Sequence, residues 1–229
     1  MQRLLAGAML LFCVNVAFGE DSERTPAAPA SGLTLTPAGS VNMQPVAPGD
    51  FWSYEVKDEI SGNIIQTRTI VVTDVTQDAI ATRFNAPKPG QFGAIQFDRS
   101  WNIVSSNAAK YSPNDGTGVR LPLQPDARWN FTSDVAYANN GPIVKRIGNS
   151  RVTGQEIVTT KAGKFDTTIF ETNYSTRNPA EPTRKSETLI RTWYSTDINH
   201  WVRRNTVVRQ NGLVYENEMI ELIDYGRKK

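Results

Sequence analysis

From Asp50 onward the chain is a succession of short segments rich in β-branched and aromatic residues, each separated from the next by Gly, Pro, Asn or Asp. Such segments are typical of β-strands. In the first, "FWSYEVKDEI", the large residues Trp52, Tyr54 and Val56 alternate with polar ones; "SGN" turns the chain and "IIQTRTIVVTDV" returns. No helical periodicity stands out, and consecutive strands without crossover helices predict an antiparallel sheet.

A second hairpin is predicted around Asn211-Gly212, a pair that favours a two-residue type I′ turn. The turn sets an expected register of Gln210 with Leu213, Val208 with Tyr215 and Arg204 with Met219. One face then carries Val202, Val208, Leu213, Tyr215 and Met219. The other carries charged pairs, Arg203 diagonal to Glu218 and Arg209 diagonal to Glu216, which we interpret as sheet surface.

The remaining strands are predicted in segments of similar composition. They are "AIATRF", "AIQFD", "WNIVSS", "RWNFTSDVAYA", "RVTGQEIVTT", "FDTTIFETNY" and "SETLIRTWYS". The fold class expected is therefore all-β, with few or no helices, in a single domain over residues 50–226.

The N-terminus has the pattern of a secretory signal peptide over residues 1–19: Arg3, an apolar run of about 15 residues, and the small residues Ala17 and Gly19 before Glu20. Cys13 is a weaker candidate for lipid attachment, because Phe12 precedes it and apolar residues follow. Cleavage after Gly19 leaves no cysteine. Residues 20–49, rich in Pro and Ala, predict a disordered linker, and residues 227–229 a basic tail.

Composition excludes several classes. The formal net charge is only +2, with acidic and basic residues interspersed, which argues against nucleic acid as a partner. One histidine and one cysteine cannot build a zinc or copper site, so neither a metal nor another cofactor is expected. "SPNDGTG", Ser112 to Gly118, lacks the spaced acidic ligands of a calcium loop and predicts an ordinary turn. No later segment is long and apolar enough for a transmembrane helix.

The stretch "RTWYSTDINHWVRR" brings Ser195, Asp197 and His200 together in sequence. A catalytic triad is usually assembled from separate segments, so we interpret Thr196 to His200 as a turn between two strands. No catalytic residue is predicted here. His200 is expected in an exposed or edge position, where replacement by alanine costs no more than about 0.5 kcal/mol.

Aromatic residues are the remaining unusual feature, since all five tryptophans fall in or beside predicted strands. They could pack in the core or line an apolar site. The candidate ligand-binding residues are Trp52, Tyr54, Trp129, Trp193, Tyr194 and Trp201.

Four segments, "PGDFWSY", "LPLQPDARW", "GQEIVTTKAGKFDTTIFE" and "TWYSTDINHWVRR", resemble motifs of bacterial envelope β-proteins of unknown function. That family is in turn similar to the class of the lipoprotein-localisation factors. The resemblance implies a curved antiparallel sheet, a half-barrel or open barrel, around an apolar ligand. Lys161 stands where the family turn usually has proline, and no segment suits the helices that cap the cavity of lipoprotein carriers.

The function expected is that of a non-enzymatic β-domain, periplasmic or secreted, that binds an apolar small molecule or an envelope protein. Two alternatives remain open. One is an envelope enzyme acting on glycans through paired carboxylates, for which the candidates are Glu156, Glu171, Glu216 and Glu218. The other is a structural interaction module with a filled interior.

Overall fold

Every regular element of the computed structural model, which describes residues 43–85, 92–138, 141–180, 183 and 185–228, is a β-strand. The strands are β1 (Asp50–Asp58), β2 (Ile64–Val75), β3 (Ala79–Asn85), β4 (Phe92–Asp98), β5 (Ile103–Ser106), β6 (Ala109–Ser112), β7 (Arg128–Tyr137), β8 (Val144–Thr160), β9 (Gly163–Arg177), β10 (Lys185–Ser195), β11 (His200–Gln210) and β12 (Leu213–Arg227). The all-β prediction is confirmed, and β6 is a strand that the sequence patterns missed.

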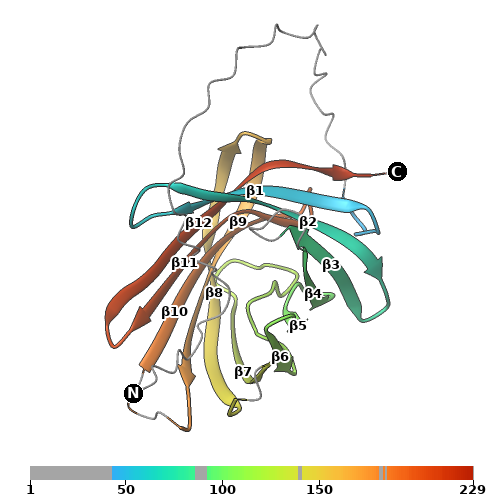
Figure 1. Cartoon of the computed structure of the whole chain (residues 1–229). Coiled ribbons are helices and arrows are strands. Elements are labelled where there is room, and N and C mark those ends of the chain that lie inside the picture. Colours follow the sequence, from blue (N-terminus) through green and yellow to red (C-terminus); the bar gives the residue numbers. More distant parts are fainter. Residues whose placement is uncertain (1–42, 86–91, 139–140, 181–182, 184, 229) are drawn as a thin grey trace, which may run out of the picture. The chain divides into compact units, whose positions relative to one another are not determined.

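Each strand pairs with its neighbours in the chain, and the meander closes because β1 also pairs with β12 (Figure 1). Every pair is antiparallel, as predicted. The closing register runs from Asp50 opposite Arg227 to Asp58 opposite Glu218. The curved sheet that the sequence implied therefore goes further than a half-barrel and becomes a closed barrel without free edges.

Strict alternation along the strands separates an inner from an outer face. In β8, the residues from Val144 to Val152 are alternately buried and exposed. In β1, Trp52, Tyr54 and Val56 are all fully buried, which confirms the face predicted for the first hairpin. The inner face of the barrel is thus set by the period of two in the sequence.

The β11–β12 hairpin has the predicted turn, with φ of 50° at Asn211 and 84° at Gly212, and Gln210 lies opposite Leu213. The predicted register beyond that pair is wrong. A bulge between Val208 and Arg209 places Val208 opposite Glu216, not Tyr215. It also places Arg204 opposite Ile220, not Met219.

A shift of one residue exchanges the two faces of a strand. Tyr215, expected to share a face with Val208, is 60% exposed, whereas Leu222 is fully buried. Arg203 lies directly opposite Glu221, to which its Nη2 donates over 2.6 Å, and not diagonal to Glu218. Glu216 and Glu218 turn toward the interior, so they are not the surface residues that the sequence predicted.

Ordered structure begins before β1 and continues past Gly226. Met43 and Val46, in the segment expected to be linker, are buried, and the Met43 amide donates to the Asp197 carbonyl over 3.1 Å. Arg227, expected in the tail, is the last residue of β12, and its Nη2 lies 3.0 Å from Oδ2 of the buried Asp50.

Residues Val41–Lys229 form one compact unit. The predicted signal peptide, Cys13 and the linker up to residue 42 lie outside the described residues. Within the described ranges, no helix has the length and apolar character needed to cross a membrane.

Candidate functional site

The two ends of the barrel differ in how deeply their inward-facing side chains are buried. We call the end with the β1–β2 and β11–β12 turns the open end. The β1–β2 turn is joined to β12 there, because the Glu59 amide donates to the Asn217 carbonyl over 2.8 Å. The other, with the β10–β11 turn, is the closed end. Along β12, Glu216 and Glu218 at the open end are partly exposed, and burial is complete at Leu222.

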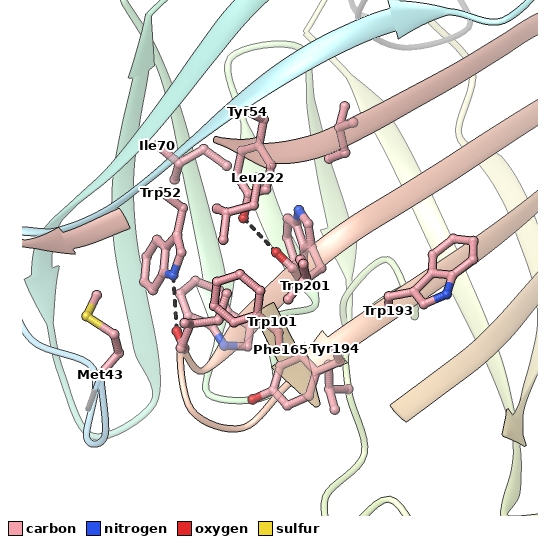
Figure 2. Packing of buried hydrophobic residues seen from close by; sticks show 14 of the residues in the cluster. Met43, Trp52, Tyr54, Ile70, Trp101, Phe165, Trp193, Tyr194, Trp201 and Leu222 are labelled. Carbon is pink, nitrogen blue, oxygen red and sulfur yellow. Dashed lines mark hydrogen bonds between the residues drawn. The ribbon is translucent and has the colours of Figure 1, made fainter. Parts of the chain in front are cut away.

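Aromatic rings fill the closed end. Trp52 donates from Nε1 to the Ile198 carbonyl over 3.0 Å, and the Tyr54 hydroxyl donates to the Trp201 carbonyl over 3.0 Å (Figure 2). The Trp52 and Trp101 rings meet edge to face, with centroids 5.5 Å apart. Their side chains are between 0% and 4% exposed, so these residues pack against one another in a solid cluster.

His200 belongs to this cluster, contrary to the prediction that it is exposed. It is the first residue of β11, is fully buried, and stacks on Trp52 with ring centroids 4.4 Å apart. Burial, and secondarily the nearby Arg204, lower its pKa well below the ordinary value. Its replacement by alanine would leave a cavity, so at this buried position we expect a loss of about 2–4 kcal/mol in the free energy of unfolding, in place of the small cost expected for an exposed residue.

The hairpin interpretation itself is confirmed, because Ser195 ends β10 opposite His200 and the turn lies between them. Nδ1 of His200 lies 2.5 Å from the Tyr54 hydroxyl. Since that hydroxyl donates to a carbonyl, Nδ1 of the histidine donates to it, and the lowered pKa keeps the ring neutral. Asp197 is exposed, so the partner that orients the imidazole is a tyrosine and not a carboxylate.

The structure brings Trp52, Tyr54 and Trp201 together, and two other predicted binding residues lie elsewhere in the same hydrophobic core. Trp193 is buried to one side of Trp201 in Figure 2, and its Nε1 donates to Glu156 Oε1 over 2.7 Å. Trp129 is partly buried, with its ring 6.0 Å from that of Phe170.

Tyr194 is 1% exposed and donates to Asn199 Oδ1 over 2.7 Å. That these six aromatic residues bind an apolar ligand stays a prediction.

The loop after β6 enters the barrel. Asp115 to Val119 are five consecutive buried residues, in the segment predicted to be an ordinary turn. Eight strands already give a barrel interior that side chains fill, so twelve strands leave more space, and this loop occupies it. Arg204 of β11 donates to the Thr117 carbonyl over 2.6 Å, and Arg146 of β8 lies 3.8 Å from Asp115 Oδ2.

Asp115 holds the loop in shape. Its Oδ1 accepts the Ile103 amide over 2.7 Å, and its Oδ2 accepts the Thr117 hydroxyl over 2.6 Å. Gly116 has a φ of 73°, and a Cβ there would lie 2.0 Å from the Phe131 ring. We call this segment, Asp115 to Val119, the plug loop. The sequence signal that could have revealed it is the run Asp115-Gly116-Thr117-Gly118, in which two glycines flank a threonine next to a carboxylate.

Polar side chains occupy the interior at the open end. Arg68 Nη1 lies 3.8 Å from Glu218 Oε1, and Glu216 faces the same way two residues earlier. Burial raises the pKa of Glu216 to about 7, the charge of Glu218 adds to the rise, and Arg68 opposes it. Burial also raises the pKa of Glu218. This pair could hold a proton, or contact a ligand group that carries hydrogen-bond donors.

The other two candidate carboxylates are not part of this pair. Glu156 accepts the hydrogen bond from Trp193, and Glu171 pairs with Arg151 over 3.0 Å and with Arg191 over 3.4 Å. Of the carboxylates considered for glycan hydrolysis, only Glu216 and Glu218 face the barrel interior together.

The rim of the open end is apolar. The β1–β2 turn and the adjoining strand ends expose large apolar side chains: Ile60 at 62%, Ile64 at 58%, Leu213 at 77%, Val214 at 47% and Tyr215 at 60%. Grouped exposed apolar residues mark sites of interaction more often than single ones do. Across the described parts of the chain, no group of three or more His, Cys, Asp or Glu side chains is placed to bind a metal ion.

Comparison with known proteins identifies the fold. No family model and no curated protein matches the chain. A lipoprotein candidate from Parabacteroides distasonis superposes with a TM-score of 0.51 at 14% identity, covering 80% of this chain and 97% of its own. A bacterial lipoprotein candidate thus shares this fold, in agreement with the resemblance of the sequence motifs.

Two further solved structures were found. An exported-protein candidate with a YmcC-like fold from Bacteroides fragilis gives a TM-score of 0.47 at 12% identity, over 79% of this chain and 97% of its own. The hypothetical lipoprotein YmcC from Escherichia coli gives 0.48 at 10% identity, over 84% and 91%.

Proposed function

We propose that this protein is an exported, non-enzymatic barrel of the bacterial envelope that binds a lipid-like amphiphile at its open end. The observation that carries the proposal is the apolar rim, where Leu213 and Tyr215 are 77% and 60% exposed in the same strand as the inward-facing Glu216 and Glu218. An exposed apolar rim beside inward-facing Arg68 and Glu218 matches a molecule with an apolar chain and a polar head.

The closed end limits how deep such a ligand goes. Trp52 and the loop around Thr117 are buried against their neighbours, so the apolar chain rests on the rim while the head faces Arg68. Burial of a few hundred Å² of apolar surface at about 25 cal/mol per Å², less the cost of association, corresponds to micromolar affinity.

Export is part of the proposal. It is supported by the apolar leader of residues 1–19 and by the name of the protein from Parabacteroides distasonis. The domain is then periplasmic, secreted or, through Cys13, lipid-anchored.

Calorimetric titration of the mature protein with a single-chain phospholipid, below the concentration at which it forms micelles, tests the proposal. The double variant Leu213→Ser/Tyr215→Ser should raise Kd at least about tenfold, as loss of 1.4 kcal/mol or more requires. The matched control is Leu121→Ser/Ile157→Ser, since both residues are exposed and apolar but lie outside the rim. Equal Kd values for the two double variants would reject the open end as the binding site.

A second candidate function rests on Glu216 and Glu218. Their shared inward face and the raised pKa of Glu216 are features of a general acid and its partner. Release of reducing ends from envelope glycans, lost in Glu216→Gln and in Glu218→Gln, would replace the non-enzymatic proposal with this one.

A further inference from the structure

A groove of about 660 Å³ crosses the outer face of the barrel over β7, β8, β9, β10 and β11. It lies between two rows of outward-facing side chains that the strand register aligns. One row is Asn130, Asn149, Asn173 and Leu189. The other includes Ile147, Ser175 and Glu187 and ends at Arg209 on β11. The groove therefore runs across the strands, on the opposite side of the sheet from the open-end interior.

Three asparagines form the most regular part of this groove. Asn130 lies opposite Asn149, and Asn149 opposite Asn173, so the amides repeat once per strand, about 4.8 Å apart. All three residues are exposed. Each amide offers two donors and one acceptor without net charge. A ligand that uses this row is long, lies across the strands and alternates donors with acceptors, as a chain of sugar hydroxyls does.

The floor of the groove is closely packed backbone. Gly148 lies between the two rows, and its Cβ position points into the barrel, where an added Cβ would lie 2.5 Å from the Phe131 ring, so this residue offers only backbone to the groove. Ile147, which is 46% exposed, and Leu189 add apolar surface that suits the C–H faces of sugar rings. Amides and aliphatic groups thus stand side by side along a fixed surface.

The rows that flank the groove are basic. On one side the register aligns Arg128, Arg151, Glu171 and Arg191. On the other side it aligns Asp134, Lys145, Arg177 and Lys185. Each row has three cations and one anion, so the two give a net +4 on a chain whose formal charge is +2. The excess positive charge is concentrated around the groove and favours an anionic ligand.

We propose that an anionic polysaccharide binds in this groove, with its hydroxyls on the asparagine row and its acidic groups toward the flanking arginines and lysines. Single-stranded nucleic acid binds largely by stacking its bases on aromatic side chains. The aromatic residues of the groove, Phe131 and Tyr174, face the barrel interior, because they alternate with the exposed asparagines. The positive charge around the groove would suit either an anionic polysaccharide or a nucleic acid. The row of asparagine amides favours the polysaccharide, because its hydroxyls can pair with them.

The experiment uses the full mature chain and measures binding of polygalacturonate, with neutral dextran, polyaspartate and single-stranded DNA of similar length as comparisons. Polygalacturonate should bind at micromolar to sub-millimolar concentration and at least tenfold more tightly than the other three. The double variant Asn149→Ala/Asn173→Ala should weaken this binding at least tenfold with an unchanged Tm. Gln155→Ala removes another exposed amide of β8 outside the groove and should bind as the unsubstituted protein does.

Equal affinity for polyaspartate or DNA would show that charge alone is recognised and would overturn the proposal. An unchanged affinity of the double asparagine variant would also overturn it, as would absence of binding. The rim variant Leu213→Ser/Tyr215→Ser should keep polysaccharide binding, so the outcome is independent of the ligand proposed for the open end.

Discussion

The closed and open ends of this barrel use the same strands for different purposes. In β1 and β12 the closed end has Trp52 and Leu222, both fully buried, whereas at the open end of β12 Glu216 and Glu218 remain partly exposed. The two ends differ in solvent access and not in secondary structure. The comparison teaches that stability and recognition can be separated along one strand, with the core at one end and the ligand site at the other.

The largest expected effect tests the closed end. Trp52→Ala removes a fully buried ring that also donates to the Ile198 carbonyl, so we expect a loss of about 3–5 kcal/mol in the free energy of unfolding. Tyr215→Ala at the open end is the control and should change it by less than about 0.5 kcal/mol. Urea denaturation measures both. Similar losses in the two variants would remove the distinction between the ends.

The second prediction concerns the plug loop. Gly116→Ala introduces a Cβ 2.0 Å from Phe131 at a φ of 73°, so it combines a steric clash with backbone strain. We expect a loss of about 2–3 kcal/mol.

Gly62→Ala is the matched control for the plug loop. Its φ is 78° but nothing lies within 4 Å of the added Cβ, so only backbone strain of about 1 kcal/mol remains. Thermal unfolding of both variants separates the two contributions. If Gly116→Ala costs no more than Gly62→Ala, the loop does not fill a tight interior.

The third prediction uses pH at the closed end. The pKa of His200 is well below 6.5 in the folded state, so the unfolded chain binds a proton that the folded one does not. The free energy of unfolding is then highest above pH 6.5. It decreases as the pH is lowered from 6.5, by about 1–1.5 kcal/mol at pH 5.5. His200→Phe should lose this part of the pH dependence. A histidine resonance that titrates near pH 6.5 in the folded protein would contradict the buried, neutral assignment.

The smallest effect is at the open end and has the opposite sign. The pKa of Glu216 rises from 4.5 to about 7 on folding, so the folded state holds more protons between these values. Stability should therefore fall as pH rises through this window, by about 1 kcal/mol after allowance for partial exposure. Glu216→Gln should remove the loss, as denaturation at pH 5 and pH 8 would measure. If the stability of Glu216→Gln depended on pH as that of the unsubstituted protein does, the raised pKa of Glu216 would be contradicted and its carboxyl would be solvated.

Much of the barrel wall could be predicted from the sequence because strand faces are encoded locally. Trp52, Tyr54 and Val56 alternate with polar residues, and all three face inward. Asn211-Gly212 makes the predicted turn. The bulge opposite Val208 and Arg209 leaves one residue of β12, Tyr215, unpaired and has no local signature, yet it decides which carboxylates face the interior.

The candidate site was harder to predict because its contacts are distant in sequence. From the sequence alone, Asp115 and Thr117 are typical turn residues. Their burial depends on contacts with Arg146 and Arg204, which come from other strands. His200 likewise has the local pattern of a loop residue, and it is buried because Trp52 and Tyr54 of β1 pack against it. The open end and the outer groove depend on closure and register, which local patterns do not specify.

The pairing of β1 with β12 also determines how this chain can fold. Asp50 and Arg227 are 177 residues apart, so the ladder between their strands closes after a long search and at a high cost in loop entropy. The neighbouring hairpins of the meander can form earlier from local contacts, and until β12 docks, β1 and β12 both present unpaired edges. We therefore expect slow folding limited by this last pairing, with an intermediate that is open between β1 and β12 and prone to self-association.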